Sequence, residues 1–411
     1  MTERHDDRIW KNTVIEFLEQ HLDQVDWYNL SSNRNAIHIL ENGLENNPNS
    51  NRINWTSLSN NSNAMHLLQK ELTNNPNSRK IEWYYLSKNP EAIHLVEKEL
   101  ENNWNSTKIN WYYLSQNPSA VHLLEKEFEN NPNSEKIDWI CLSMNPNASS
   151  LLEKNPSKMD WSEILRNPNT VHLIEKELEN DPNSKKIDWQ TLSYHPYAVE
   201  LLKKYPEKIS WHSLSSNKNA IDILKEELER DLNSSKLNWN FLSSNPNAIP
   251  LLEVELENNP SSNRLNWDSL CTNPNAIPLL EIEFKNNPNS EKLHWLRIAK
   301  NKSPNAIHLL EKRIKYSTNI DQYCFLYLSK NPNAINLLEN HLDNNYKTKV
   351  SWSDLSINPK AIHLLKKNRY NIDWRALSGN EGWYELDYPS IKKRMDIWRE
   401  DLMKAVYHPD K

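Results

Sequence analysis

Tryptophan recurs in this chain at an almost fixed interval, and this periodicity constrains the fold more than any other feature. Thirteen of the 17 tryptophans occupy the same position of a repeated segment. They are Trp27, Trp55, Trp83, Trp111, Trp139, Trp161, Trp189, Trp211, Trp239, Trp267, Trp295, Trp352 and Trp374. The usual step between them is 28 residues, as from Trp27 to Trp55, and three steps are shortened to 22 residues. One repeat, between Trp295 and Trp352, has Phe325 in place of the tryptophan. A period of about 20–50 residues is typical of a solenoid or repeat array.

The repeated segment predicts two short helices joined by an Asn-Pro turn. The residue before the tryptophan is usually Asp, Asn or Ser, and these types are the preferred N-caps, so a first helix begins at the tryptophan. In one unit it runs from Trp139 to Asn145, because a residue before proline avoids helical angles. The same Asn-Pro opens a second helix with apolar residues at helical spacing. The pattern leaves open which of the asparagines around Pro146 caps it.

These patterns predict an all-α fold, an α-solenoid of about fourteen helix-turn-helix repeats with tryptophans stacked in a continuous core. Residues 25–378 form the predicted repeat array, which we expect to be a curved rod. Residues 1–24 predict one amphipathic helix that caps the array, because a terminal repeat must cover an exposed apolar end. Residues 379–411 depart from the repeat and predict a C-terminal cap or a docking tail.

Composition excludes several classes of function. A net charge of −6 with interleaved signs argues against a nucleic-acid binder, which needs a basic stripe. Three glycines in 411 residues leave no glycine-rich phosphate loop. Cys141, Cys271 and Cys324 lie far apart in ordinary repeat positions, so neither a disulfide framework nor a metal site is predicted. No apolar run reaches the length of a membrane span. We expect a soluble, cytoplasmic protein without a cofactor.

The repeat itself resembles a known group. The unit Ile-Asp-Trp-x-x-Leu-Ser-x-Asn-Pro-Asn-Ala-Ile-His-Leu-Leu-Glu, present from Val25 to Ser378, is similar to the Asn/Trp-rich repeat of uncharacterised proteins of giant DNA viruses of the mimivirus kind. The ending from Met395 to Pro409 is also similar to endings in that group. The resemblance implies a viral protein acting in the cytoplasm of an infected host. It implies no catalytic residue.

The two positions after each tryptophan vary most and lie off the Trp/Leu face. Tyr84, Tyr85, Tyr112 and Tyr113 occupy them in adjacent units, and Trp104 stands nearby in a position that proline holds in other units. Exposed aromatic side chains gathered in this way are typical of protein-binding hot spots. We therefore predict that these five residues contribute to a protein interface. The alternative is that they pack on neighbouring units.

Two other repeated positions have structural interpretations. The histidines at one position of the second helix point away from its buried face and would lie roughly 10 Å apart, too far to share a metal, which predicts a solvated polar position. They are His38, His66, His94, His122, His172, His308 and His363. The asparagines at the first position of the turn between the two helices are predicted to be caps and turn closures. They are Asn33, Asn61, Asn89, Asn117, Asn145 and Asn167.

No catalytic arrangement stands out from the repeat, so the sequence favours a non-enzymatic scaffold that binds host or viral proteins. One alternative is an adaptor whose C-terminal tail recruits a ubiquitin ligase or Hsp70. The tail ends in His408-Pro409-Asp410, a tripeptide similar to that of J-domain co-chaperones, although the helix that follows it there has no counterpart here. A structural role in a virion or viral factory is another alternative. A repeat-based RNA reader is a third, and the acidic composition argues against it.

Overall fold

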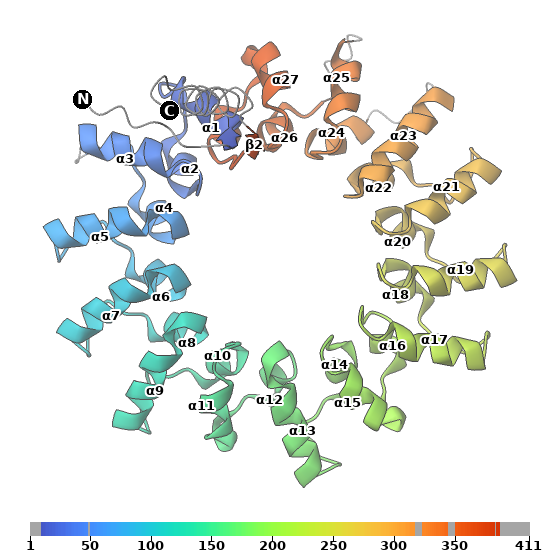
Figure 1. The fold of residues 1–411 in the computed structure, drawn as a ribbon, viewed down its shortest axis with the longest axis horizontal. Coiled ribbons are helices and arrows are strands. Elements are labelled where there is room, and N and C mark those ends of the chain that lie inside the picture. Colours follow the sequence, from blue (N-terminus) through green and yellow to red (C-terminus); the bar gives the residue numbers. More distant parts are fainter. Residues whose placement is uncertain (1–9, 48–49, 317–322, 344–349, 383, 387–411) are drawn as a thin grey trace, which may run out of the picture. The chain divides into compact units, whose positions relative to one another are not determined.

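The structure is a computed structural model that describes residues 10–47, 50–316, 323–343, 350–382 and 384–386. In these ranges the chain is an α-solenoid of short helix pairs (Figure 1). It divides into two compact units, one formed by Met1–Ala64 with Val350–Lys411 and the other by Met65–Lys349. The terminal residues of the array therefore belong to one unit.

Each first helix begins at the repeat tryptophan, or near its replacement Phe325. The first helices are α2 (Trp27–Ser32), α4 (Trp55–Asn60), α6 (Trp83–Lys88), α8 (Trp111–Gln116), α10 (Trp139–Met144), α12 (Trp161–Ile164), α14 (Trp189–Tyr194), α16 (Trp211–Leu214), α18 (Trp239–Ser244), α20 (Trp267–Thr272), α22 (Trp295–Lys300), α24 (Tyr323–Ser329), α26 (Trp352–Ile357) and α28 (Trp374–Ser378). The residue before the tryptophan is the predicted N-cap. For example, Asp138 Oδ1 accepts a hydrogen bond from the Cys141 amide at 2.8 Å.

A second helix follows each first helix except α28 in the described residues, and the second helices are mostly longer. They are α3 (Ile37–Asn46), α5 (Met65–Asn74), α7 (Ile93–Asn102), α9 (Val121–Asn130), α11 (Ser149–Glu153), α13 (Val171–Asn180), α15 (Val199–Lys204), α17 (Ile221–Arg230), α19 (Ile249–Asn258), α21 (Ile277–Asn286), α23 (Pro304–Tyr316), α25 (Ile335–Asp343) and α27 (Ile362–Lys367). The 22-residue steps shorten this helix, as in α11 and α15. In the unit Met65–Lys349, Figure 1 shows first helices along the inner side of the curve and second helices along the outer side.

Short 3₁₀ turns connect some of these helices. They are η1 (Ser62–Ala64), η2 (Pro90–Ala92), η3 (Pro118–Ala120), η4 (Pro156–Lys158), η5 (Pro168–Thr170), η6 (Pro206–Lys208) and η8 (Arg369–Asn371). The first asparagine of the Asn-Pro turn is the cap, because its side chain accepts the amide two residues later. Asn117 caps Ser119 in this way at 3.0 Å.

Leucine, rather than tryptophan, forms the innermost layer. Leu114 and Leu142 in first helices and Leu124 and Leu152 in second helices are 0% exposed. The repeat tryptophans are partly buried, and the least exposed of them is Trp239, whose exposed fraction is 9%. The expected tryptophan core is therefore wrong in one respect, because the leucines are fully buried and the tryptophans are not. Each tryptophan begins a helix of about six residues, and its large indole reaches the edge of the buried leucine layer.

The indoles fill the space between consecutive second helices and are covered by cations. The Trp139 ring meets Phe128 of the preceding second helix edge-on, with ring centroids 5.7 Å apart. Lys158 Nζ lies 5.0 Å from the Trp139 centroid, and Lys136 Nζ lies 4.9 Å from that of Trp111. A lysine stem and ammonium can cover an indole face while remaining in contact with water.

In 28-residue units a buried or partly buried glutamate ties the second helix to the return loop. Glu127 is 3% exposed and accepts hydrogen bonds from Ser134 Oγ at 2.5 Å and Lys136 Nζ at 3.2 Å. Burial raises the pKa of this carboxyl, but its hydrogen bonds outweigh burial and hold the pKa below its ordinary value. Glu99 repeats the arrangement with Ser106 Oγ at 2.6 Å. The Asn-Ser sequence of the return loop thus has a structural role that the periodicity did not reveal.

In the unit formed by Met1–Ala64 with Val350–Lys411, the first and last helices of the described residues pack on each other. Helix α1 (Thr13–Glu19) buries Val14, Ile15, Phe17 and Leu18. The Phe17 ring stacks on that of Trp374 in α28, with centroids 5.8 Å apart. Strand β1 (Trp10–Asn12) pairs antiparallel with β2 (Tyr384–Leu386), the one sheet in the described part of the chain. The first and last described repeats of this unit therefore pack on each other.

The predicted terminal regions can now be located. Within the predicted capping region 1–24, helix α1 covers the apolar side of α28. Within the predicted tail 379–411, residues 379–382 and β2 contact the N-terminal part of the chain. Residues 387–411, with the predicted last helix and His408-Pro409-Asp410, lie outside the described residues. No helix of the described ranges is both long and apolar enough to cross a membrane.

Candidate functional site

A ladder of buried asparagines positions the first helices side by side. Asn145 is 1% exposed, and its Nδ2 donates to the carbonyl oxygens of Ser115 and Asn117 in the preceding unit, both at 3.0 Å. Its Oδ1 accepts from the Asn147 amide at 3.0 Å. One side chain therefore caps its own turn and joins two units. The sequence predicted the cap, but not the bond to the neighbouring unit.

Two further links accompany the rung at Asn145. The Asp138 amide donates to Ser115 Oγ at 3.1 Å, and that hydroxyl donates in turn to the Trp111 carbonyl at 2.9 Å. The second asparagine of the turn, Asn147, donates from Nδ2 to the Pro118 carbonyl at 3.0 Å. These bonds fix the register of neighbouring units, so side chains at equivalent positions line up along the first-helix face.

The four tyrosines of the predicted interface form one cluster on this face. Tyr84 and Tyr85 lie on α6, and Tyr112 and Tyr113 lie on α8. The Tyr84 hydroxyl donates to that of Tyr113 at 2.7 Å, and their ring centroids are 4.4 Å apart. The hydrogen bond raises the pKa of Tyr84 above its ordinary value. Tyr84 and Tyr112 remain 43% and 49% exposed, so the cluster, here called the aromatic patch, faces solvent.

Trp104 does not join the aromatic patch. Its indole N–H donates to Glu127 Oε2 at 2.6 Å, and its ring lies 6.0 Å from that of Trp111. Lys126 Nζ lies 4.6 Å from the centroid of the Trp104 ring. Trp104 thus belongs to the return loop beside the second helix α9. In this unit it adds a third donor to the glutamate that ties down the loop.

The exposed apolar surface continues onto α10, although no residue of this helix is among those predicted for the interface. Ile140 follows Trp139 as Tyr112 follows Trp111, and it is 56% exposed. Met144, at the end of α10, is 48% exposed. The sequence contains a signal for Ile140, because this residue occupies the variable position directly after the repeat tryptophan. We call the aromatic patch together with Ile140 and Met144 the extended patch.

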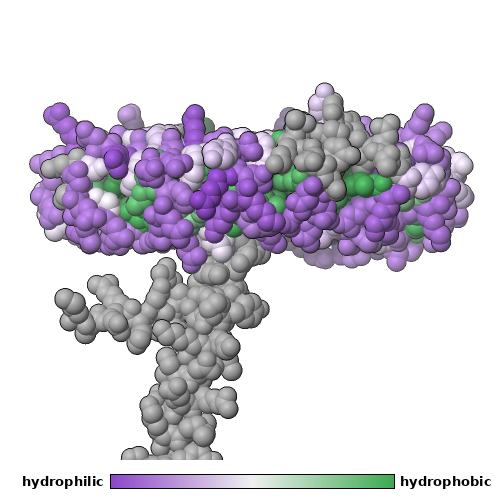
Figure 2. All heavy atoms as spheres, turned by 90° about the horizontal axis from the view of Figure 1, so that it is seen from above, coloured by the Kyte–Doolittle hydropathy of each residue, from purple (hydrophilic) through white to green (hydrophobic). Residues whose placement is uncertain are grey.

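The extended patch is poor in charge compared with the rest of the chain. Helices α6, α8 and α10 have six residues each and together contain one charged residue, Lys88, whereas 25% of the whole chain is charged. Lys88 Nζ itself lies 5.9 Å from the Tyr113 centroid. The face drawn in Figure 2 is, by contrast, mostly hydrophilic, with hydrophobic residues in narrow strips. An exposed surface that is both apolar and weakly charged is a feature of binding sites.

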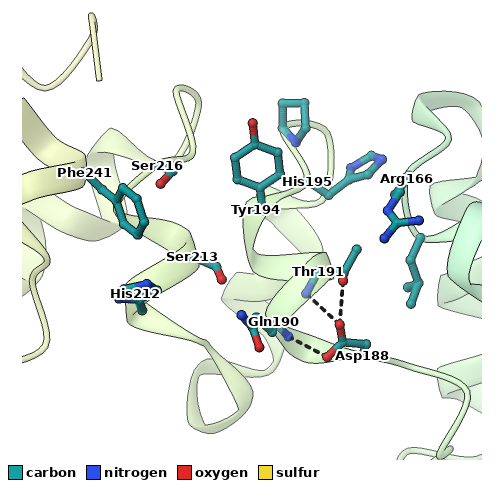
Figure 3. Close-up of a pocket in the computed structure, with 12 residues that line it drawn as sticks. Arg166, Asp188, Gln190, Thr191, Tyr194, His195, His212, Ser213, Ser216 and Phe241 are labelled. Atoms are coloured by element: carbon teal, nitrogen blue, oxygen red, sulfur yellow. Dashed lines mark hydrogen bonds between the residues drawn. The ribbon is translucent and has the colours of Figure 1, made fainter. Parts of the chain in front are cut away.

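A cavity of about 750 Å³ lies farther along the first helices, lined by residues of the units that begin with α12, α14, α16 and α18 (Figure 3). Its wall includes apolar or aromatic residues Leu165, Tyr194, Pro196 and Phe241. In Figure 3 the Tyr194 ring stands between Phe241 and Arg166. Helices α12 and α16, whose units contribute to the wall, have four residues each rather than six.

Several polar groups of this cavity are bound to one another or to residues just outside its lining. Asp188 accepts from the Thr191 hydroxyl at 2.5 Å, and that bond lowers the pKa of its carboxyl. Arg166 pairs with Glu163 at 3.0 Å. His212 Nδ1 lies 2.9 Å from Asn238 Nδ2. The cavity therefore offers an aromatic wall with polar groups already held in place, a lining suited to holding a side chain.

One wall of the cavity contains a departure from the asparagine ladder. His195 occupies the position of the buried asparagine and is 2% exposed. Its Nε2 donates to the Asn167 carbonyl and its Nδ1 accepts from the Tyr197 amide, both at 3.3 Å. Burial lowers the pKa of the imidazole. Both roles require the neutral ring, because a protonated Nδ1 cannot accept.

The repeated histidines do not form a metal ladder. Six of the seven are exposed, and His38 is partly exposed. His122 Nε2 lies 2.7 Å from Glu97 Oε1 of the preceding unit. Over the residues that the structure describes, no group of three or more His, Cys, Asp or Glu could hold a metal ion.

No family model, curated protein or solved structure matches this chain.

Proposed function

We propose that the chain is a non-enzymatic scaffold that binds another protein along its first-helix face. The extended patch supports this proposal most directly, because Tyr84, Tyr112 and Ile140 occupy one exposed position in three consecutive units. Tyrosine is one of the residue types that supply most of the binding energy at protein interfaces, and the core of such interfaces is poor in charge. The resemblance to giant-virus repeat proteins sets this activity, within the proposal, in the cytoplasm of an infected cell.

The repeat spacing limits the kind of partner. Neighbouring first helices pack roughly 8–10 Å apart, so the exposed side chains recur at that interval. A polyproline II segment advances about 9 Å per three residues, with every third side chain on one side. An extended protein segment with a large apolar side chain at every third residue would therefore match Tyr84, Tyr112 and Ile140 in turn. The partner we propose is such a segment.

Peptide binding provides a direct test. Two peptides of identical composition would be compared, with the same number of leucines. The leucines are three residues apart in the first peptide and two residues apart in the second. The proposal predicts tighter binding of the first peptide to the wild-type chain. Replacing Tyr84, Tyr112 and Ile140 by serine together should weaken it by more than about 100-fold, at roughly 1–2 kcal/mol per hot-spot residue.

Tyr28 offers a matched control. It holds the same position on α2 and is 58% exposed, but its counterparts in the adjoining repeats are Thr56 and Arg375. Tyr28→Ser should leave peptide binding unchanged. Equal binding of both peptides, or equal losses in the triple and control variants, would contradict the proposal.

The adaptor and virion alternatives concern other parts of the chain. A docking role for the tail would depend on residues 387–411, since residues 379–382 and β2 already contact the N-terminal part. Affinity capture from host cells with and without residues 387–411 would test recruitment of a ubiquitin ligase or Hsp70. Abundant copies in purified virions would favour the structural role.

A further inference from the structure

The two ends of the array each hold one half of a helix pair. Helix α28 has the tryptophan and leucine of a first helix, but no second helix follows it in the described residues. Helix α1 precedes Trp27, and no first helix comes before it among residues 10–12. Counted back from the tryptophan, Leu18 corresponds to Leu202 and Val25 to Ile209, so α1 has the length and apolar positions of the second helix in a 22-residue step.

The contacts confirm that α1 takes the place of that second helix. His21 lies against Trp374 with ring centroids 5.3 Å apart, just as Tyr205 lies against Trp189 at 5.5 Å. Phe17 stacks on the same indole, and Lys366 Nζ lies 5.3 Å from the Phe17 centroid. Helices α28 and α1 thus form one composite unit from opposite ends of the sequence.

The composite unit joins the next one through the same bonds that join consecutive units. The Asp26 amide donates to Ser378 Oγ at 2.8 Å. Asn33 Nδ2 donates to the carbonyl oxygens of Ser378 at 3.0 Å and Asn380 at 2.9 Å. Asn35 Nδ2 donates to the Glu381 carbonyl at 2.7 Å. We call this junction, with the β1–β2 pair, the seam.

We propose that the seam also forms between two copies of this chain, with α28 and residues 379–382 and 384–386 of each copy packing on β1, α1 and α2 of the other. Within a helix pair elsewhere the chain joins the two helices directly, whereas α28 and α1 are held together by non-covalent contacts alone. The bonds available to a seam between two copies are the same as those within one copy. Domain swapping has a low energetic cost under these conditions, since no new interface is required.

Mass action determines when the exchange is observed. Closure within one copy is favoured at low protein concentration, because the two ends of one chain have a high effective concentration for each other. The ratio of exchanged dimer to closed monomer should rise roughly tenfold for each tenfold increase in protein concentration during refolding. The dimer should persist on dilution, because release requires the seam to open.

Cysteine pairing across the β1–β2 pair distinguishes the two arrangements in the full chain. Lys11 and Glu385 are Cα partners in this antiparallel pair. Such partners lie about 4.5–5.5 Å apart, within the range of about 4.4–6.8 Å that a disulfide spans. The native Cys141, Cys271 and Cys324 are buried, and burial raises the pKa of Cys271 to about 11, so they do not compete.

The experiment mixes two single variants. Isotope-labelled Lys11→Cys and unlabelled Glu385→Cys chains would be unfolded, refolded together at low and high concentration, and oxidised. The proposal predicts a disulfide between a labelled and an unlabelled chain, increasing with refolding concentration. The double variant Lys11→Cys/Glu385→Cys, refolded at low concentration, should form the disulfide within one chain.

Controls separate exchange from random oxidation. Lys11→Cys mixed with Glu229→Cys, an exposed position outside the seam, should give only background dimer. Phe17→Ala should reduce the disulfide in both arrangements. The proposal is overturned if the mixed variants give no more dimer than this control while the double variant closes internally. Failure of the double variant to close would overturn the seam itself.

Discussion

Removing one rung of the asparagine ladder should destabilise the junction between two units much more than removing a neighbouring surface bond. Asn145→Ala deletes two bonds to carbonyl oxygens of the preceding unit and one bond to its own turn. At about 1 kcal/mol for each hydrogen bond, the loss is about 3 kcal/mol. The Asn117 carbonyl keeps a second donor, the Ala120 amide, which limits the cost at that atom.

Two further variants make this prediction specific. Asn147→Ala removes a bond of the same chemistry to the same neighbouring unit, but at an exposed position, and should cost less than about 1 kcal/mol. Asn145→Asp keeps the shape and the cap acceptor, but it places a carboxylate against two carbonyl oxygens. It should therefore cost more than Asn145→Ala at neutral pH.

The assay should report on the junction as well as on the whole chain. Repeat arrays need not unfold in one step, so urea unfolding followed by circular dichroism should be combined with hydrogen exchange of helices α8 and α10. The expected order of stability is wild type, Asn147→Ala, Asn145→Ala and then Asn145→Asp. Our reasoning is refuted if Asn145→Ala costs no more than Asn147→Ala, or if the aspartate is tolerated better than the alanine.

Three other predictions concern burial and charge. Because the pKa of Glu127 is lowered in the fold, its carboxylate stabilises the fold above the ordinary glutamate pKa of about 4.3, and this stabilisation is lost as pH falls below that value. Glu127→Gln should therefore reduce the loss of unfolding free energy at acid pH, measured in a pH series of unfolding curves. Because burial lowers the pKa of His195, the unfolded chain gains a proton first as pH falls below about 6.5. His195→Asn should restore a ladder donor and remove the stability loss between pH 7 and 5, and an unchanged pH profile would count against this explanation. Trp139→Ala should cost roughly 3 kcal/mol in denaturant unfolding, at the low end for a large buried aromatic because the ring is partly exposed; a cost below about 1 kcal/mol would show that the indole is not a packing residue.

The local architecture could be predicted from the sequence because each signal lies within a few residues. Asp138 before Trp139 predicts a capped helix start, and Asn145-Pro146 predicts its end. The four tyrosines could be expected to lie together because the 28-residue period brings equivalent positions of adjacent units side by side. Trp104 could not be assigned correctly, since its direction depends on Glu127 in the following second helix.

What the sequence determined by itself is the repeated unit, namely its two helices, their caps and the position that remains exposed. The tertiary structure decided how the units join. The asparagine bonds to the preceding unit, the cavity beside the short helices and the pairing of α1 with α28 involve residues about 20 to 350 positions apart. Local propensities do not specify such contacts, because they depend on the distance and angle at which one unit stacks on the next.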